Sequence, residues 1–321
     1  MPVVRYCGAA FEAAPGEAVL DTLLRNGVIV PNSCRAGVCQ SCLLRAAEGA
    51  VPDDSRRGLG AALVEQGYFL SCVCRPSGDL AVEPAGGLET PATIAELDRL
   101  SPTVIRVRLR MAEPLVYRAG QYITLHRADG LARSYSLASL PGEDTLELHV
   151  RRAPQGKMSG WLFDQARAGE PVSIRGPAGA CFYTAGRPEQ PLLLAGTGTG
   201  LAPLIGICRD ALRTGHTGPV HLYHGALRPD GLYLADVLRA LAAGHSAFHY
   251  HPVVLEGDEA SGALVGALDK TVVNRHPKLA GWRGFVCGDP SIVRLLQKKL
   301  FLAGMASSDI AADAFVEAPA P

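Results

Sequence analysis

The feature that most constrains this chain is the spacing of four of its nine cysteines. Three of them lie in the segment CRAGVCQSC at residues 34–42, and Cys72 follows after a further 29 residues. Nine is an odd number, and the opening MPVVRY lacks the basic stretch and apolar run of an export signal, so a disulfide framework explains the cysteines poorly. A group of thiols in a reducing compartment indicates a metal centre instead.

The spacing C-x-x-x-x-C-x-x-C with one distant cysteine is that of plant-type 2Fe–2S centres, which need four thiolates. Zinc knuckles favour paired C-x-x-C units, whereas here the fourth cysteine stands alone. Gly37 supplies the flexible backbone that such a loop requires. Cys74 is the rival fourth ligand, but the 29-residue gap favours Cys72. The predicted cluster ligands are Cys34, Cys39, Cys42 and Cys72.

The chain has 321 residues, which predicts about two domains, or three small ones. Apolar residues make up 48% and charged residues 19%, so packed cores are expected throughout. Lysine plus arginine and aspartate plus glutamate both number 31, and this balance argues against a general nucleic-acid or anionic-membrane surface. No run approaches the roughly 18 apolar residues of a membrane span. We therefore expect a cytoplasmic chain with no membrane insertion.

Three successive patterns predict three domains, over 1–88, 89–187 and 188–321. In the first, a helix at 16–27 ends at Asn26-Gly27 among short strands, as in a small mixed sheet. The second has closely spaced alternating strands and one helix near 159–168, which is typical of an antiparallel barrel. The third alternates buried strands with helices, including a helix predicted over 264–274 and one over 289–303 that opens with Asp-Pro. This alternation predicts a doubly wound parallel sheet.

Two segments of the predicted barrel suit a flavin. In RSYS at 133–136, an arginine can pair with a pyrophosphate and a tyrosine can flank the ring. In GKMS at 156–159, a helix begins, and its free amides can hold phosphate. We also assign His149 and Val150, at the end of an expected strand over 146–151, to this site.

Two segments of the third domain suit a dinucleotide. AGTGTGLAP at 195–203 follows the first buried strand and opens a helix, where glycines let a pyrophosphate approach the backbone. It differs from the G-x-G-x-x-G fingerprint, and an ordinary tight turn is the alternative. CGDP at 287–290 stands at the end of another strand. The predicted nucleotide contacts are Gly198, Thr199, Gly200, Pro203, Cys287, Gly288 and Pro290.

Together these segments resemble the ferredoxin–NAD(P)H reductase superfamily, and in their order the three-module reductase components of multicomponent bacterial oxygenases. The resemblance implies a β-grasp 2Fe–2S ferredoxin, an FAD barrel and a nicotinamide nucleotide domain. Gln40 stands where many reductase-linked members carry glycine.

The resemblance also implies residue roles. Arg133 would bind phosphate, Tyr135 would pack on the ring with Ser134 beside it, and Ser136 would lie near the flavin nitrogen that accepts hydride. Ser159 would assist at the pyrophosphate with Gly156, Lys157 and Met158. Thr199 would hold the carboxamide and Cys287 would face the reactive carbon, so Ser136, Thr199 and Cys287 are the catalytic candidates. Phe315 would cover the flavin, with an ordinary core phenylalanine as the alternative.

Electron counting then suggests the function. A nicotinamide gives up two electrons as a hydride, a 2Fe–2S cluster accepts one at a time, and a flavin converts between the two. We expect an NADH-dependent reductase, with NADPH less favoured because Arg228 is the only cation of the segment HGALRP at 224–229. The acceptor implied by the resemblance is a terminal oxygenase. A radical deoxysugar dehydratase is the second candidate, a redox-sensing or scaffold role is the third, and we expect a monomer. His245, His249 and His251 fit a strand better than a metal site.

Overall fold

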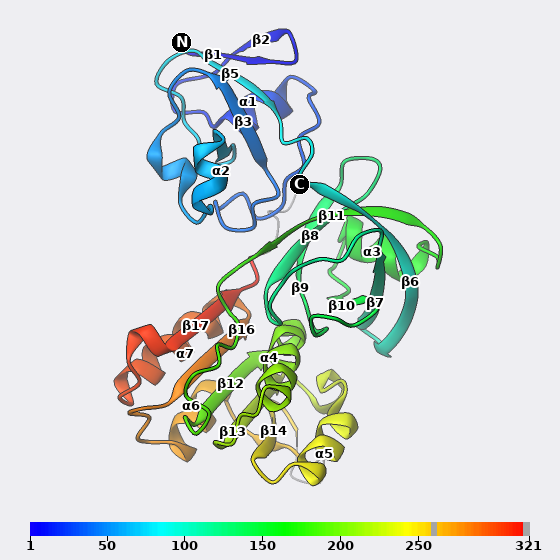
Figure 1. Ribbon diagram of the computed structural model, residues 1–321, viewed down its shortest axis with the longest axis vertical. Helices are drawn as coiled ribbons and strands as arrows, with labels where there is room; N and C mark the ends of the chain where they lie inside the picture. The colour runs from blue at the N-terminus through cyan, green and yellow to red at the C-terminus, as the bar shows by residue number, and fades with distance from the viewer. Residues whose placement is uncertain (258–261, 317–321) are drawn as a thin grey trace.

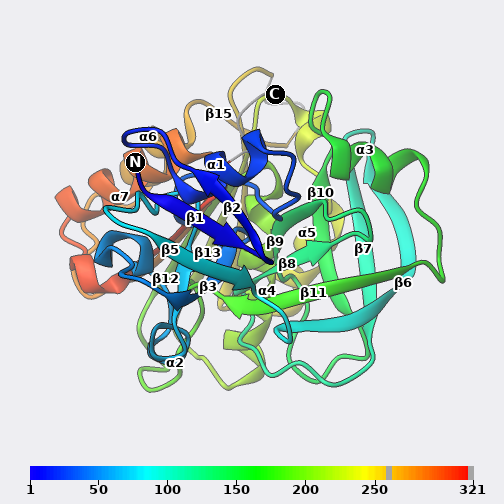
Figure 2. The same cartoon turned by 90° about the horizontal axis from the view of Figure 1, so that it is seen from above.

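The computed structural model describes residues 1–257 and 262–316. Its strands form three sheets, one for each predicted domain, and each sheet has its own hydrophobic core. Figure 1 shows them along the long axis of the molecule: the N-terminal module at the top, the barrel in the middle and the C-terminal module at the bottom. Seen from above, the N-terminal module lies over the other two (Figure 2).

The N-terminal module is a mixed five-stranded sheet in the order β2-β1-β5-β3-β4. Helix α1 (Val19–Arg25) buries Val19, Leu20 and Leu23, and the chain leaves it through Gly27 at a φ of 78°, as the Asn-Gly signal predicts. Its other elements are β1 (Val3–Tyr6), β2 (Ala9–Glu12), β3 (Leu43–Glu48), α2 (Ala61–Glu65), β4 (Tyr68–Leu70) and β5 (Leu80–Pro84). Only β1 and β5 pair in parallel, which confirms the β-grasp prediction.

The middle module is a six-stranded antiparallel sheet in the order β10-β7-β6-β11-β8-β9. A bridge between Leu137 and Leu148 joins its two edges, so the sheet closes as a barrel. Its elements are β6 (Glu89–Ser101), β7 (Val104–Met111), β8 (Tyr122–His126), β9 (Ala132–Ser136), β10 (Leu146–Arg151), α3 (Lys157–Asp164) and β11 (Pro171–Ala178). Strand β6 did not stand out in the sequence because register shifts at Ile94/Glu96 and Arg99/Ser101 interrupt its alternation.

The C-terminal module is a six-stranded, wholly parallel sheet in the order β15-β14-β13-β12-β16-β17. This confirms the doubly wound prediction. Its elements are β12 (Leu192–Thr197), α4 (Leu201–Arg213), β13 (Val220–Ala226), α5 (Ala235–Gly244), β14 (Phe248–Val254), β15 (Leu264–Val265), α6 (Leu268–Arg275), β16 (Arg283–Gly288), α7 (Pro290–Leu302) and β17 (Ile310–Ala314).

The helix predicted over 264–274 is partly wrong, since Leu264 and Val265 pair with β14 as strand β15. Gly266 follows at a φ of 146°, where helix is impossible, and α6 begins at Leu268. The helix predicted from Asp-Pro is confirmed: the Asp289 carboxylate accepts hydrogen bonds from the amides of Ser291 (2.8 Å) and Ile292 (3.2 Å).

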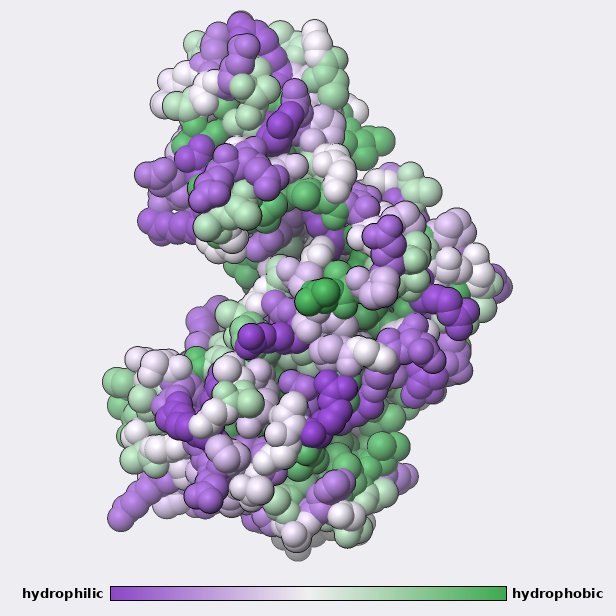
Figure 3. Space-filling view, in the orientation of Figure 1, coloured by the Kyte–Doolittle hydropathy of each residue, from purple (hydrophilic) through white to green (hydrophobic). Residues whose placement is uncertain are grey.

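The surface mixes hydrophilic and hydrophobic residues (Figure 3), and on the face shown it is hollowed between the N-terminal module and the C-terminal module. In the described ranges, no helix has the length and apolarity that crossing a membrane requires.

Candidate functional site

The cysteine loop (34–42) and the start of the segment after β4 bring the four predicted ligands together as two pairs. Cys34 and Cys39 are one pair, and Cys42 and Cys72 are the other. The Cys34 sulfur accepts hydrogen bonds from the Cys39 thiol and from the amides of Ala36 and Cys39, both at 3.4 Å. These bonds lower the pKa of Cys34 to about 5. The Cys42 thiol likewise lowers the pKa of Cys72. Each pair therefore contains one thiol predisposed to ionise, the form in which sulfur binds metal.

This donor set fits a 2Fe–2S cluster, in which each iron takes two cysteine ligands. In the part of the chain that the structure describes, no three Cys, His, Asp or Glu side chains converge on one ion position. The two thiol pairs are the arrangement in which a 2Fe–2S cluster takes its ligands. The rival ligand Cys74 contacts Ser55 instead, and burial raises its pKa to about 11.

The loop backbone explains the residue types within it. Gly37 has a φ of 74°, and a Cβ there would lie 3.2 Å from the Val73 side chain. Gln40 has a φ of 58°, the left-handed conformation that glycine adopts without strain. Its side chain donates a hydrogen bond to the Gly58 carbonyl at 2.9 Å, which anchors the residue in that conformation.

The predicted flavin residues lie on β9 (Ala132–Ser136) and in the first turn of α3, apart from His149 and Val150 on β10. Helix α3 begins at Lys157 with no side-chain cap, so its first amides are available to a pyrophosphate. The close fit at this turn requires glycine, because a Cβ on Gly156 would fall 2.4 Å from the Ser159 hydroxyl. Tyr135 is half-buried against the barrel core. Free amides at a helix N-terminus fit the pyrophosphate of a flavin dinucleotide.

The side chains of two predicted flavin residues contact other parts of the protein. The Arg133 guanidinium donates to the carbonyls of Asn32 (2.9 Å) and Ala132 (2.7 Å). The Val150 side chain is buried in the barrel core, so only its backbone is open to a ligand.

The predicted nucleotide residues come from the carboxyl ends of β12 and β16. The glycine-rich turn packs directly on the CGDP segment: a Cβ on Gly200 would lie 2.4 Å from the Cys287 carbonyl, and one on Gly288 would lie 2.7 Å from the Thr197 carbonyl. A Cβ on Gly198 meets no atom within 4 Å, so this glycine faces open space. Thr199 lies in the same turn, Pro203 is in the first turn of α4 and Pro290 opens α7. The glycines thus close one side of the turn and leave the other open to a dinucleotide.

Asp313, which did not stand out in the sequence, links Ser136 to Cys287 at the carboxyl ends of these strands. The Ser136 hydroxyl donates to the Asp313 carboxylate at 2.7 Å, and Asp313 is the register partner of Cys287 in the β16–β17 ladder. Burial raises the pKa of Asp313 and of Cys287. Phe315 lies two residues beyond, half-buried, with its amide donating to the Gly288 carbonyl at 2.8 Å. In the sequence, the only signal near this carboxylate was Phe315, two residues further on.

Three family profiles match the chain in order: a 2Fe–2S iron–sulfur cluster binding domain over 6–77, an oxidoreductase FAD-binding domain over 91–183 and an oxidoreductase NAD-binding domain over 194–298. The reductase component of the naphthalene 1,2-dioxygenase system of Pseudomonas putida is 33% identical over 308 residues, 94% of each chain. The chain belongs to the three-module ferredoxin–NAD(P)H reductase superfamily.

Further relatives agree with this reductase assignment. The reductase subunit of an aromatic O-demethylase from Amycolatopsis is 38% identical over 306 residues, covering 89% of this chain and 90% of the relative. Among solved structures, an Amycolatopsis cytochrome P450 reductase superposes with a TM-score of 0.70 at 35% identity, covering 98% of this reductase and 99% of that chain.

The cysteine loop of the reductase docks on the flavin barrel through its own carbonyl groups. The Val38 carbonyl accepts a hydrogen bond from the Tyr122 hydroxyl at 3.0 Å, and the Cys39 carbonyl accepts one from the Ser134 hydroxyl at 3.1 Å. Arg175 donates to the carbonyls of Gln40 (2.9 Å) and Ser41 (2.7 Å). Strands β8, β9 and β11 therefore hold the thiols against the strand that carries RSYS.

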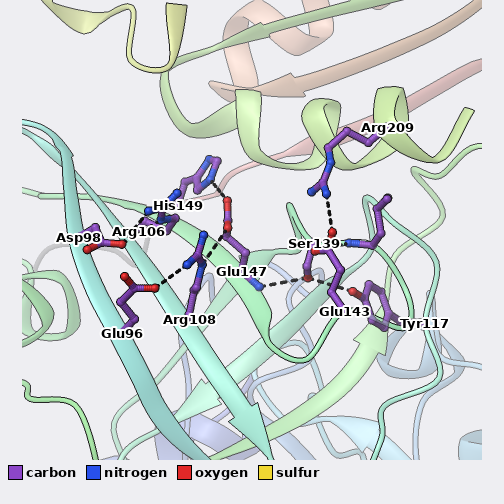
Figure 4. A network of polar contacts seen from close by, with 11 residues as sticks. Glu96, Asp98, Arg106, Arg108, Tyr117, Ser139, Glu143, Glu147, His149 and Arg209 are labelled. Atoms are coloured by element: carbon purple, nitrogen blue, oxygen red, sulfur yellow. Dashed lines mark hydrogen bonds and ion pairs between the residues drawn. The ribbon is translucent and has the colours of Figure 1, made fainter. Parts of the chain in front are cut away.

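A second interface joins the barrel of the reductase to the nucleotide module (Figure 4). His149 bonds through Nε2 to Glu147 at 2.9 Å and through Nδ1 to the Tyr233 hydroxyl, outside the view, at 3.1 Å. Glu147 also accepts from Arg108 at 3.3 Å, and Arg209 of α4 pairs with Glu143. The His149 side chain thus lies between two modules, and both of its nitrogens have protein partners.

Three further histidines of the reductase, on β13 and β14, form a stacked group. His249 and His251 lie on β14, as predicted for a strand, while His245 follows α5. His221 of β13 stacks on both, and its Nδ1 lies 3.1 Å from Nε2 of His251. These ring contacts pack β13 against β14 within the sheet.

Proposed function

We propose that this reductase takes hydride from NADH and delivers single electrons through the cysteine loop to a separate terminal oxygenase. The observation that carries the proposal is the docking of the loop carbonyls of Val38, Cys39, Gln40 and Ser41 on strands β8, β9 and β11. A bound flavin supplies the change from two-electron to one-electron transfer. The docking of the cysteine loop on the barrel supports a short electron-transfer path from the flavin barrel to the thiols. The relatives are, by their names, reductase components of oxygenase systems.

The proposed residue roles follow from position. The thiol pairs Cys34/Cys39 and Cys42/Cys72 would hold the cluster, and the first turn of α3 would hold the flavin pyrophosphate. At the nucleotide edge, the open face of Gly198 and Thr199 would receive the nicotinamide dinucleotide beside Cys287. The Ser136 hydroxyl, which donates a hydrogen bond to Asp313, would lie where the barrel meets the nucleotide module. We place the domain boundaries at 88/89, where β6 begins, and at 187/188, before β12.

We further propose that the free reductase is a cytoplasmic monomer. An electron carrier must present its cysteine loop to a second protein, and a monomer leaves most of the N-terminal module free to do so.

The function is tested by anaerobic mixing of the holo-reductase, in catalytic amounts, with NADH and the terminal oxygenase encoded nearest its gene. We expect the metal centre of the oxygenase to be reduced, and flavin and 2Fe–2S absorption to bleach together in the reductase. Reduction of a sugar dehydratase but not of the oxygenase would favour the second candidate. A flavin that NADH does not reduce would disprove the proposal.

The preference for NADH is attributed to Glu256, which follows β14. Its carboxylate pairs with Arg228 at 2.9 Å, and its amide bonds the Leu227 carbonyl at 2.8 Å, so it lies at the end of β13 where nucleotide domains read the ribose 2′ position. An acidic residue there accepts a hydrogen bond from a ribose hydroxyl and repels a 2′-phosphate. Arg228, the only cation of the HGALRP segment, is thereby paired with the Glu256 carboxylate.

We therefore expect Glu256→Gln to raise kcat/KM for NADPH about fivefold, since relieving one like-charge contact near 4 Å in water is worth about 1 kcal/mol. The activity with NADH should fall or stay level. Steady-state kinetics with both nucleotides measure this, with Glu189→Gln as control because Glu189 is exposed and precedes β12, at the amino-terminal end of that strand. An equal NADPH activity in both variants would refute the role of Glu256.

A further inference from the structure

One charged group of the barrel that bonds the cysteine loop directly is Arg175 of β11. Its Nη2 donates to two successive carbonyls, those of Gln40 (2.9 Å) and Ser41 (2.7 Å). Gln40 and Ser41 are the two residues between Cys39 and Cys42, and these cysteines belong to different thiol pairs. The guanidinium therefore binds the loop between the two pairs. The other barrel contacts with this loop come from uncharged hydroxyl groups.

The guanidinium has no carboxylate in direct contact. In the described ranges, none of the ion pairs within 4.0 Å involves Arg175. The carboxylate that acts on it is Glu89, its register partner on β6, which accepts a hydrogen bond from Ser173 at 2.7 Å and lies 3.4 Å from His126. Arg175 is itself half-buried. A cation in that position acts on the thiols with little screening by solvent.

The Arg175 contact also acts on one of the two non-glycine residues of the loop, Arg35 and Gln40, that have a positive φ. Gln40 is in the left-handed conformation at a φ of 58°, held on one side by its own bond to Gly58. Arg175 holds the carbonyl of the same residue from the barrel side. A non-glycine residue persists in such a conformation only where its surroundings fix it, and here both sides do.

We propose that Arg175 is a positioning residue for the iron–sulfur centre, which it orients against the flavin barrel and whose reduction potential it raises. The proposal rests on the proposed function, because it assumes that the thiols hold a 2Fe–2S cluster. Net charge and hydrogen bonding around such a cluster set its potential, and a nearby cation favours the form with one more electron. Arg175 would thus make electron transfer from the flavin to the cluster more favourable. It would also hold the cysteine loop in a fixed position against the flavin barrel.

The test compares Arg175→Met and Arg175→Lys with Arg110→Met, an exposed arginine of β7, as the matched control. The cluster potential is measured by redox titration followed by electron paramagnetic resonance, and flavin-to-cluster transfer by stopped flow. We expect the methionine variant to shift the flavin–cluster equilibrium toward reduced flavin about tenfold, or about 59 mV for one electron. The lysine variant should keep most of the potential, because it keeps the charge, but transfer electrons more slowly, because its ammonium ends one bond short of the position of Nη2 on a more flexible side chain and holds the two carbonyls less firmly.

Reduction of the flavin by NADH should be unchanged in all three variants. If Arg175→Met fails to assemble its cluster, Arg175→Gln replaces it with the same expectation, since it removes the charge and keeps an amide donor. A potential equal to that of the control in the charge-removing variant would overturn the proposal. A wild-type reductase without a cluster signal would instead reject the proposed function, so the two failures are distinguishable.

Discussion

Replacing Cys39 by serine is expected to cut electron delivery to cytochrome c and to the oxygenase by at least about 100-fold. Loss of outer-shell support alone costs roughly 10–100-fold at metal sites, and serine removes a ligand itself, because a hydroxyl is a poor substitute for a soft thiolate. The amide of residue 39, which bonds the Cys34 sulfur at 3.4 Å, is kept in this variant, so the change is confined to the ligand atom. The backbone carbonyl that bonds Ser134 remains.

Because the barrel and the nucleotide module have separate cores, they should fold and bind flavin in this variant. NADH should still reduce the flavin, and ferricyanide, which takes electrons directly from flavin, should still be consumed. The matched control is Cys7→Ser, an exposed cysteine outside the cysteine loop. Full cytochrome c reduction by a Cys39→Ser protein shown to contain no iron would make the flavin the exit point and contradict the proposed path.

Replacing Gly200 by alanine is expected to slow flavin reduction by NADH about 100-fold, since a displacement near 1 Å in the reacting geometry costs about that much. The added Cβ would lie 2.4 Å from the Cys287 carbonyl oxygen and 2.9 Å from the Gly288 Cα. Both are backbone atoms, which cannot turn aside as a side chain can, so the glycine-rich turn must separate from the end of β16. That movement displaces the dinucleotide site as a unit.

Stopped-flow reduction of the bound flavin by NADH measures this effect, while flavin and cluster absorption report that the other modules are intact. Gly244→Ala is the control, because a Cβ at this position, at the end of α5 in the same module, meets no atom within 4 Å. An unaltered rate in Gly200→Ala would mean that the packing of the two segments does not set the nucleotide geometry.

Several elements of the reductase could be predicted because their cause is local in the sequence. The thiol spacing specifies a cluster, Asn26-Gly27 ends a helix, and Asp289-Pro290 begins one. The alternation of strand and helix after residue 188 predicts a parallel sheet. Strand β6 escaped prediction because its bulges disrupt the period of two, and β15 escaped because two residues are too few to show a period.

The contacts that build the electron path were decided only by the tertiary structure. Arg175 bonds Ser41 across 134 residues of chain, and Ser136 bonds Asp313 across 177. No local pattern predicts such pairs, because they depend on how three separately folded sheets pack and on which strand ends meet. The sequence therefore determined which cofactor chemistry each module can hold, since ligand type and loop conformation are local. The packing of the modules decided which residues link those sites, since hydrogen bonds between distant segments form only once both surfaces are in place.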